Sequence, residues 1–380
     1  MVIGANFGDE GKGLMTDYFV SKFNGNCFVV RFNGGAQAGH TVVTPDGERH
    51  KFSHFGSGSF WGAPTYLSKF FIVNPLLFMD ELSEFDFDPV VYIDENCLVS
   101  TPYDMYLNQL TEKLRGDKRH GSCGVGINET IERSNEEEYF LKIKDLRYDK
   151  IWKEKFKRIA QEYYPQRLKQ LGNMANPIFN DDLFVDIFKE FKNKFFECDH
   201  EVLSGQDLVF EGAQGLLLDQ NHKNFPYVTR SNTGFQNVKE ILEDINREDD
   251  DTEVVYVTRS YLTRHGRGPF PTEIEGLPYG NVVDHTNIFN EFQEHLRFGI
   301  IDLDDLVETI NEDISKNNIE KRSLAVTCLD QIDREVIKFY ENGIFCNSSI
   351  YYFIEGLWGA TSGDKIYKSF GRTRETILTN

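Results

Sequence analysis

The feature that most constrains the fold of this chain is its start, where the apolar pair Val2 and Ile3 leads into a glycine-rich loop. From residue 4 the loop reads GANFGDEGKG, with four glycines and one cation, Lys12. Glycine lets backbone N–H groups turn inward around an anion, and the N-terminus of a following helix adds positive potential. The next residues, LMTDYF, are typical of an amphipathic helix. The stretch therefore predicts strand, phosphate loop and helix, with a glycine-rich surface turn as the alternative.

The loop departs from the common phosphate-loop pattern G-x-x-x-x-G-K-[ST] at both ends. Asn6 stands where the first glycine belongs, and Gly13 stands where the hydroxyl residue belongs. Without that hydroxyl to hold magnesium, Gly13 argues against a kinase or a GTPase of the usual kind. Asp9 is the unusual member, because its carboxylate would repel a phosphate. It fits only if a metal ion bridges the two groups, or if it takes up a proton.

Alternation of apolar runs and helical patterns predicts an α/β fold with a large, mostly parallel central sheet flanked by helices. Runs that predict strands lie at residues 27–32, 70–75, 90–93, 207–215, 254–257 and 324–330, and a helix is expected at about 75–82. Ligands of such sheets bind at the carboxyl ends of the strands. We expect one domain over residues 1–380, since no Pro/Ser-rich linker divides it. The charged segment at about 148–200 predicts mostly solvated helices without chemistry.

Charge, cysteine pattern and apolar content limit the classes of partner that the chain could bind. The formal net charge of −20 argues against nucleic acid, because a binding groove would have to overcome that field. Six cysteines occur singly with no C-x-x-C pair, which predicts reduced thiols and no zinc site. The chain has no basic and apolar leader before Val2 and no run of about 18 apolar residues. We therefore expect a cytoplasmic protein that binds no membrane.

Further chemistry-bearing residues follow the predicted strands. His40 ends the loop NGGAQAGH, and its ordinary pKa suits proton transfer near neutrality, although a histidine bonded within a turn is the alternative. Arg264, His265 and Arg267 lie among glycines, where a phosphate or carboxylate could approach. Asp330 ends an apolar run and could accept both N–H groups of a guanine edge, or could cap a helix.

Taken together, these segments resemble adenylosuccinate synthetase, the family that joins aspartate to C6 of a purine nucleotide at the cost of GTP. The resemblance rests on five motifs in order: GDEGKG at 8–13, AGHT at 38–41, FEGAQG at 210–215, PYVT at 226–229 and GPFPTE at 268–273. It covers most of the chain and is weak between about residues 148 and 198. The chain is shorter than typical bacterial members.

The resemblance implies roles around the triphosphate. Asp9 matches the general base and magnesium ligand, with the backbone carbonyl of Gly39 completing the Mg²⁺ shell. His40 matches the acid that donates to the γ-phosphate, and Lys12 the catalytic lysine that holds the donor phosphates. The implied donor-nucleotide residues are Gly8, Glu10, Gly11, Lys12, Gly13, Gly39, His40, Thr41, Asp330, Ser369 and Gly371. Because adenine offers no donor pair to Asp330, we expect GTP or dGTP, with ATP as the alternative.

It also implies the acceptor and amino-acid sites, and a homodimer in which an arginine crosses from the partner subunit. Acceptor-nucleotide contacts are expected from Gln37, Ser122 or Cys123, Gln214, Thr229, His265 and, as the crossing arginine, Arg133. L-Aspartate is expected at Arg297, with neighbours from residues 290–293, Gln293 among them.

Three departures separate this chain from ordinary members. The four consecutive arginines of the family are replaced by the stretch EHLRFG, in which only Arg297 survives, and losing the arginine near the ribose suggests that a deoxynucleotide is accepted. Gln37, Ser122-Cys123 and His265 differ on the purine side and resemble the phage branch that makes 2-aminoadenylosuccinate from dGMP for diaminopurine DNA. Cys328 replaces a lysine of the donor-base motif.

We therefore expect a ligase acting on dGMP or GMP, located in the host bacterial cytoplasm if phage-encoded. Ordinary adenylosuccinate synthesis from IMP is the alternative within the class, and the retained Asp9 favours it, because we expect the phage branch often to lack that residue. A nucleotide-binding protein of the same fold without catalysis is the alternative from another class.

Overall fold

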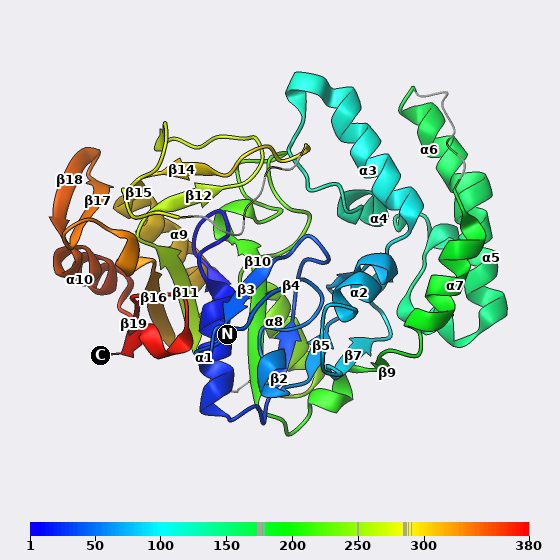
Figure 1. The fold of residues 1–380 in the computed structure, drawn as a ribbon, viewed down its shortest axis with the longest axis horizontal. Helices are drawn as coiled ribbons and strands as arrows, with labels where there is room; N and C mark the ends of the chain where they lie inside the picture. Colours follow the sequence, from blue (N-terminus) through cyan, green and yellow to red (C-terminus); the bar gives the residue numbers. More distant parts are fainter. Residues whose placement is uncertain are drawn as a thin grey trace.

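The computed structural model describes residues 1–172, 177, 179–248, 251–283, 287, 289 and 291–379. Ten strands of the described chain form one sheet (Figure 1). Their order is β20 (Ile377–Thr379), β19 (Ile366–Ser369), β16 (Arg322–Thr327), β11 (Val254–Arg259), β1 (Val2–Gly4), β10 (Leu208–Gly215), β2 (Phe28–Arg31), β5 (Thr65–Leu67), β7 (Val91–Asp94) and β9 (Phe196–Cys198). All pairs are parallel except β19 with β20. The predicted α/β fold class with a mostly parallel sheet is confirmed.

Strand β1 lies in the middle of the sheet, and its two apolar residues serve opposite faces. Val2 packs in a cluster with Leu14 and Met15 of α1 (Lys12–Lys22). Ile3 packs in the large cluster of the other face, which includes residues of α8 (Gln236–Asp244). Successive side chains of a strand point to opposite faces, and both faces of a parallel sheet are covered, so the strands are apolar throughout.

Helix α1 is buried over most of its surface, so the expectation of an amphipathic helix is wrong. Eight of its residues are buried, including Lys12, Thr16 and Asp17. The helix contacts β1 and β10 on one side, and the hairpin strand β3 (His40–Val43) and the 3₁₀ turn η9 (Arg374–Thr376) also touch it. A helix covered on several sides has no solvated face to carry a polar stripe.

Most of the remaining helices of the first half share a second core beside strands β5 and β7. They are α2 (Pro75–Leu82), α3 (Pro102–Arg115), α5 (Asp149–Arg158), α6 (Tyr164–Gln170) and α7 (Asp181–Phe191), with a π-helical turn η5 (Ile159–Tyr163) before α6. Helix α4 (Ile127–Arg133) contacts α3. The helix predicted at 75–82 is confirmed. It begins where the Asn74 side chain accepts hydrogen bonds from the N–H groups of Leu76 and Leu77.

The prediction of mostly solvated helices at 148–200 is wrong for one face of this segment. Trp152, Phe156, Phe184, Phe188 and Phe191 are buried in one cluster with side chains of α2 and α3. Charged residues cover the other face, which is the pattern of an amphipathic helix rather than of a solvated one. Figure 1 shows α5, α6 and α7 together at one end of the molecule, opposite the β17 (Val336–Glu341) and β18 (Ile344–Ser349) hairpin and α10 (Ile350–Thr361).

Smaller sheets lie above the carboxyl ends of the central strands (Figure 1). One joins β12 (Leu262–Arg264), β14 (Arg297–Gly299) and β13 (Glu273–Ile274), and the hairpin of β3 with β4 (Arg49–Phe52) forms another. Two short pairs join β6 (Ile72–Val73) to β8 (Leu98–Val99) and β15 (Ile301–Asp302) to β17. Helix α9 (Leu303–Asn317) packs beside α10 and β17. None of the helices in the described part of the chain has the length and apolar character needed to cross a bilayer.

Candidate active site

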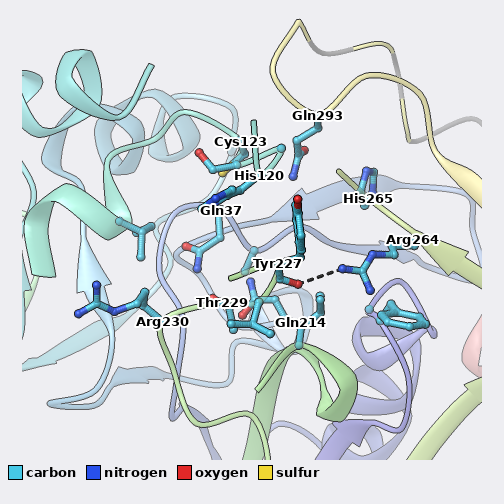
Figure 2. A pocket seen from close by; sticks show the side chains of 18 of the residues that line it. Gln37, His120, Cys123, Gln214, Tyr227, Thr229, Arg230, Arg264, His265 and Gln293 are labelled. Carbon is cyan, nitrogen blue, oxygen red and sulfur yellow. Dashed lines mark hydrogen bonds between the residues drawn. The ribbon is translucent and has the colours of Figure 1, made fainter. Parts of the chain in front are cut away.

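A cavity of about 670 Å³ opens at the carboxyl ends of the central strands, where the phosphate loop meets the loops after β2, β10 and β11. Fifteen of the residues predicted from the sequence line it. They are Gly8, Asp9, Gly11, Lys12, Gly13, Gln37, Gly39, His40, Thr41, Ser122, Cys123, Gln214, Thr229, His265 and Gln293. Segments far apart in the sequence thus form a single cavity, and Figure 2 labels ten of its residues.

The phosphate loop is shaped from within by Glu10, whose side chain is buried. Its Oε1 accepts hydrogen bonds from the N–H groups of Asn6, at 3.2 Å, and Gly8, at 2.7 Å, while Oε2 lies 2.7 Å from Lys12 Nζ. A Cβ at Gly4 would lie 2.3 Å from this carboxylate, so the glycine leaves the room that Glu10 occupies. Glu10 itself does not line the cavity. Its structural part is to close the loop and to hold the Lys12 ammonium.

Asp9 adopts a backbone φ of 60° at the tip of the loop and carries the carboxylate into the cavity. Its Oδ2 lies 2.9 Å from Nε2 of His265, and its backbone carbonyl accepts a hydrogen bond from Arg259 Nε. Burial alone would raise the pKa of Asp9, but the hydrogen bond and charge of His265, with the charges of Arg259 and Lys12, hold it below its usual range. Asp9 is therefore ionised at neutral pH.

His265 is the partner that the sequence placed on the purine side. Burial alone would lower the pKa of His265, but the hydrogen bond and charge of Asp9 raise it above its usual value. The pair joins the phosphate loop to the loop after β12. Thr263 strengthens this link, since its Oγ1 lies 3.2 Å from the Gly8 carbonyl.

His40 is held by a carboxylate from the middle of β10. Nδ1 of His40 lies 2.7 Å from Oε1 of Glu211, whose carboxylate also accepts hydrogen bonds from the backbone N–H and the hydroxyl of Ser57. The Nε of Arg31 lies 3.8 Å from Glu211 Oε2. The carboxylate fixes the ring through Nδ1 and leaves Nε2 for a ligand.

Glu211 is fully buried, and its charge is balanced locally. Burial alone would raise its pKa, but the charges of His40 and Arg31 and the hydrogen bonds from His40 and Ser57 lower it to about 2. Burial also lowers the pKa of His40, against the opposing pull of Glu211. Glu211 is therefore anionic at neutral pH, with the permanent charge of Arg31 nearby.

The part of the cavity wall that the sequence predicts to contact the acceptor purine has side-chain oxygens without a hydrogen-bond donor. The side-chain oxygens Gln37 Oε1 and Gln214 Oε1 are buried and have no hydrogen-bond partner in the described structure. Burial raises the pKa of the Cys123 thiol to about 11. The Ser122 hydroxyl is hydrogen-bonded to the Asn108 side chain at 2.9 Å. Two orphaned amide oxygens in one cavity fit a ligand that donates hydrogen bonds.

Comparison with known proteins identifies the family. The family model described as adenylosuccinate synthetase matches residues 1–334. The adenylosuccinate synthetase of Clostridium beijerinckii is 34% identical over 298 residues, covering 73% of this chain and 66% of the relative. That of Haloarcula marismortui is 31% identical over 305 residues, covering 73% of this chain and 64% of the relative.

The chain belongs to the adenylosuccinate synthetase family. Its match spans just under two thirds of the length of these curated relatives.

Solved structures show the same fold at low sequence identity. The fully ligated adenylosuccinate synthetase of Plasmodium falciparum matches with a TM-score of 0.79 and 19% identity, over 100% of this chain and 99% of that one. The succinoaminodeoxyadenylate synthetase of cyanophage S-2L, described as bound to dGMP and to dATP as an energy donor, matches with a TM-score of 0.64 and 14% identity. That match covers 99% of this chain and 93% of the phage enzyme.

The residues predicted for the donor base lie outside the cavity, on the far side of the phosphate loop. They follow β16 and β19, which are neighbours, and the turn η8 (Leu329–Gln331) contacts β19. Asp330 is exposed, and the Ser369 hydroxyl donates to the Gly371 carbonyl at 2.8 Å. Thr327, at the end of β16, donates from Oγ1 to the Glu10 carbonyl at 2.7 Å, so this edge adjoins the loop. A donor-base site there stays a prediction.

Arg133 does not reach toward another subunit, so its prediction as the crossing arginine of the family is wrong. The side chain is fully buried in its own chain, with Nε 2.9 Å from Asp104 Oδ1 and Nη2 2.8 Å from the Val99 carbonyl. Nη1 donates to the Tyr139 carbonyl. Arg133 is the last residue of α4 and joins that helix to α3. Its guanidinium is bonded within its own chain and does not extend toward a partner subunit.

Arg297 also stands away from the cavity. Its Nε lies 2.7 Å from Glu273 Oε1, Nη2 pairs with Oε2 of the same carboxylate, and Nη1 donates to the carbonyls of Gly266 and Gly268 at 3.1 Å each. The structure therefore uses Arg297 to fix the loop after β12. Gln293 lines the cavity, whereas Asn290 lies outside the described residues.

Sequence reasoning missed several residues of the cavity and one that lies behind it. Glu211, which holds His40 from behind, could have been found, since an acidic residue interrupts the otherwise apolar run LVF of a predicted strand. Arg167 lies in α6, in the segment predicted to carry no chemistry, yet it lines the cavity. Arg115, Arg230 and Arg259 also line the cavity and received no predicted role. Only the folded chain places these cations together.

Proposed function

We propose that this chain is a ligase that joins L-aspartate to C6 of a 6-oxopurine nucleoside monophosphate, driven by GTP through a 6-phosphoryl intermediate. The observation that carries the proposal is the meeting of Asp9, Lys12 and His40 in one cavity with the orphaned amide oxygens of Gln37 and Gln214. Membership of the adenylosuccinate synthetase family supports it.

Asp9 starts the reaction by accepting the N1 proton of the acceptor purine. It is ionised at neutral pH, and His265 and Arg259 hold its carboxylate and its backbone in place. Loss of that proton makes O6 nucleophilic toward the γ-phosphate. Removing the proton with a group already positioned is general-base catalysis.

His40 acts at the phosphoryl group that is transferred. Because Nδ1 faces Glu211, a proton given to the phosphate must come from Nε2, so the ring must carry two protons when it donates. Burial lowers the pKa of His40 in the structure, and the negative charge of a bound triphosphate would raise it. Lys12 adds the positive charge that stabilises the phosphates. The amine of aspartate then displaces the 6-phosphoryl group.

Magnesium fits the oxygen donors of this loop. Asp9 and Gly39 line the same cavity, and His265 occupies only one oxygen of the Asp9 carboxylate, which leaves the other for a cation. Carboxylate and carbonyl oxygens are the ligands that Mg²⁺ prefers. When bound, the ion would neutralise charge on the donor phosphates.

For the acceptor we propose dGMP or GMP. The 2-amino group of guanine carries two N–H donors, which suit the two unpartnered amide oxygens, whereas hypoxanthine lacks that group. The phage enzyme of the same fold is described with dGMP, which is in line with this choice. Its description with dATP as energy donor makes ATP or dATP the alternative to GTP. We further propose that the chain works as a homodimer in a host cytoplasm.

Ordinary adenylosuccinate synthesis from IMP is the second candidate. It is favoured by the names of the curated relatives and by the retained Asp9. Incubating the protein with L-aspartate, GTP and Mg²⁺ while offering dGMP, GMP and IMP in turn separates the two. The 2-amino succinyl nucleotide, read by mass spectrometry, supports the first proposal, and product from IMP alone supports the second. Absence of phosphate release with every acceptor would leave a nucleotide-binding protein without catalysis.

A further inference from the structure

Arg264 is a buried cation without an anionic partner. It lies at the end of β12, is 1% exposed and lines the cavity. Its Nη2 donates to the Tyr227 carbonyl at 2.9 Å, as Figure 2 shows, while Nε and Nη1 have no hydrogen-bond partner. No ion pair found among the described residues includes it. An unsatisfied buried charged donor is costly, so a ligand that satisfies it gains affinity.

Four other arginines that line the cavity differ in this respect. Within the described chain, Glu112, Glu129, Glu132 and Glu294 pair with Arg115, Arg167, Arg230 and Arg267 respectively. Their charges are neutralised by the protein. Arg264 instead stacks over the Phe7 ring, with the guanidinium carbon 4.4 Å from the ring centre. That contact stabilises a cation but leaves the N–H groups free.

Burial lowers the pKa of Arg264 to about 10, with the charge of Arg297 adding to the effect, so the side chain stays positive at neutral pH. The charge of Glu273 opposes this lowering, but both oxygens of that carboxylate are bonded to Arg297. Glu273 therefore forms its ion pair with Arg297 and not with Arg264. The charge is left for a group that is not part of the described chain.

The position of Arg264 is fixed beside the reacting end of the cavity. On either side of it in sequence, Thr263 bonds the Gly8 carbonyl and His265 bonds Asp9. Arg264 itself covers Phe7. Three successive residues of β12 and its following loop therefore meet residues 7–9 of the phosphate loop. An anion bound to Arg264 lies next to the carboxylate that faces the acceptor base.

We propose that Arg264 binds a carboxylate of the amino-acid substrate and so brings its amine to C6 of the acceptor. The inference rests on the proposed ligase function and gives the amino acid an anchor in place of Arg297, which Glu273 and the loop carbonyls occupy. A guanidinium forms strong charge-assisted hydrogen bonds with carboxylates. Gly268 keeps this anchor in place, because a Cβ there would lie 2.3 Å from Arg264 Nη2.

The test compares the wild type with R264M and R264K in the full-length chain, at saturating acceptor nucleotide, GTP and Mg²⁺. Loss of charge-assisted hydrogen bonds is expected to raise KM for L-aspartate by about 10- to 100-fold in R264M, and less in R264K. KM for both nucleotides should change by less than about threefold. Arg158→Met is the matched control, since Arg158 also stacks on an aromatic ring, that of Tyr139, but lies outside the cavity.

Two outcomes overturn the inference. If KM for L-aspartate stays at the wild-type value in R264M, Arg264 does not hold the carboxylate. If KM for a nucleotide rises instead, the anion on Arg264 is a phosphoryl group. Circular dichroism establishes whether each variant is folded. If R264M is not folded, the KM values of R264K are compared with those of the wild type instead.

A binding measurement separates this inference from the proposed function. Succinate carries both carboxylates of aspartate without the amine, so calorimetry with succinate and acceptor nucleotide reads the site without turnover. Weaker succinate binding to R264K than to the wild type supports the carboxylate site even if no acceptor gives product. Equal binding of succinate to R264K and to the wild type would contradict the carboxylate site at Arg264, even if the ligase activity is found.

Discussion

Asp9 places a negative charge in a loop whose surroundings are cationic. Three cationic side chains, those of His265, Arg259 and Lys12, act on its carboxylate. Glu10 adds a second negative charge nearby, but its carboxylate pairs with Lys12 and accepts hydrogen bonds from two backbone N–H groups. The loop therefore separates a carboxylate that lines the cavity from a buried one that holds the loop, although the two are adjacent in sequence.

Replacing Asp9 by Asn should remove the proton acceptor and keep the loop's shape. We expect turnover to fall by about 100- to 10,000-fold, the usual contribution of a general base. Binding of GTP, measured by its effect on the thermal unfolding temperature, should persist without magnesium, because Lys12 and the loop amides remain. Turnover of D9N within about threefold of the wild type would show that another group takes the proton.

Glu211→Gln tests whether His40 needs its carboxylate. The amide can still accept from Nδ1, but it no longer stabilises the doubly protonated ring. We expect kcat to fall at least about tenfold while KM for the acceptor nucleotide changes little. A variant with unchanged kcat would mean that His40 does not act as an acid. Glu162→Gln, on the exposed face of η5, is the control.

Glu211→Gln also changes the free energy of unfolding, by an amount that depends on pH. The pKa of Glu211 is about 2 in the folded protein against an ordinary value of 4.5, so the ionised carboxylate contributes stability above pH 4.5 and loses it as pH falls toward 2. The difference in free energy of unfolding between the wild type and E211Q should therefore be largest near pH 7 and shrink below pH 4.5. Urea unfolding at several pH values measures it. A difference that grows in acid would contradict the assignment.

Among the elements, helices α5 to α7 show how a charged segment can be structural. Their aromatic side chains meet one another and the side chains of α2 and α3, with Trp152 and Phe188 rings stacked at 5.3 Å and Phe78 meeting Phe191 at 5.0 Å. The charged residues form ion pairs on the outer face, such as Lys153 with Asp149. Such exposed ion pairs contribute little to the free energy of unfolding, so the packing of the aromatic face holds the helices in place.

Trp152→Ala should destabilise this layer strongly. The side chain is fully buried, and truncating a buried tryptophan typically costs about 3–5 kcal/mol. Urea unfolding measures the change. Tyr148→Ala is the control, since Tyr148 is 62% exposed and its loss should stay within about 0.5 kcal/mol. Equal effects of the two substitutions would mean that the aromatic face does not stabilise the layer.

At the scale of the whole molecule, the last strands complete the sheet beyond the part matched by the family model. Residues 1–334 end after β16, and β19 then pairs with β16 while β20 covers β19. The β17–β18 hairpin and α10 fill the connection between them. The end of β19 also carries the residues predicted for the donor base. The C-terminal segment thus closes one edge of the sheet next to the phosphate loop.

Removing residues 362–380 should therefore expose the edge of β16. Unpaired backbone groups on a long apolar strand favour aggregation, so we expect a lower unfolding temperature, poorer solubility and weaker GTP binding. Removing only residues 377–380 is the control, because β19 would still cover β16. If the longer truncation unfolds at the wild-type temperature, the C-terminal strands are not part of the cooperative unit.

Local patterns in the sequence were enough for the fold class, for the strand, loop and helix at the start of the chain, and for several other elements. The helix at 75–82 could be bounded because Asn74 and Pro75 are start signals that act within one turn. Strands 90–93 and 254–257 were found close to β7 and β11, since apolar runs of that length bury both faces of a parallel sheet.

What only the tertiary structure decided are the pairings across the sheet. Asp9 and His265 are 256 residues apart, and His40 and Glu211 are 171 apart, yet each pair shares a hydrogen bond. Arg133 and Arg297 carry the charge expected of binding residues, but their neighbours Asp104 and Glu273 engage them. The sequence determined which residues can do chemistry, because side-chain chemistry is a property of the residue. Strand order and loop packing decided which of them meet, because contacts between distant residues depend on the whole fold.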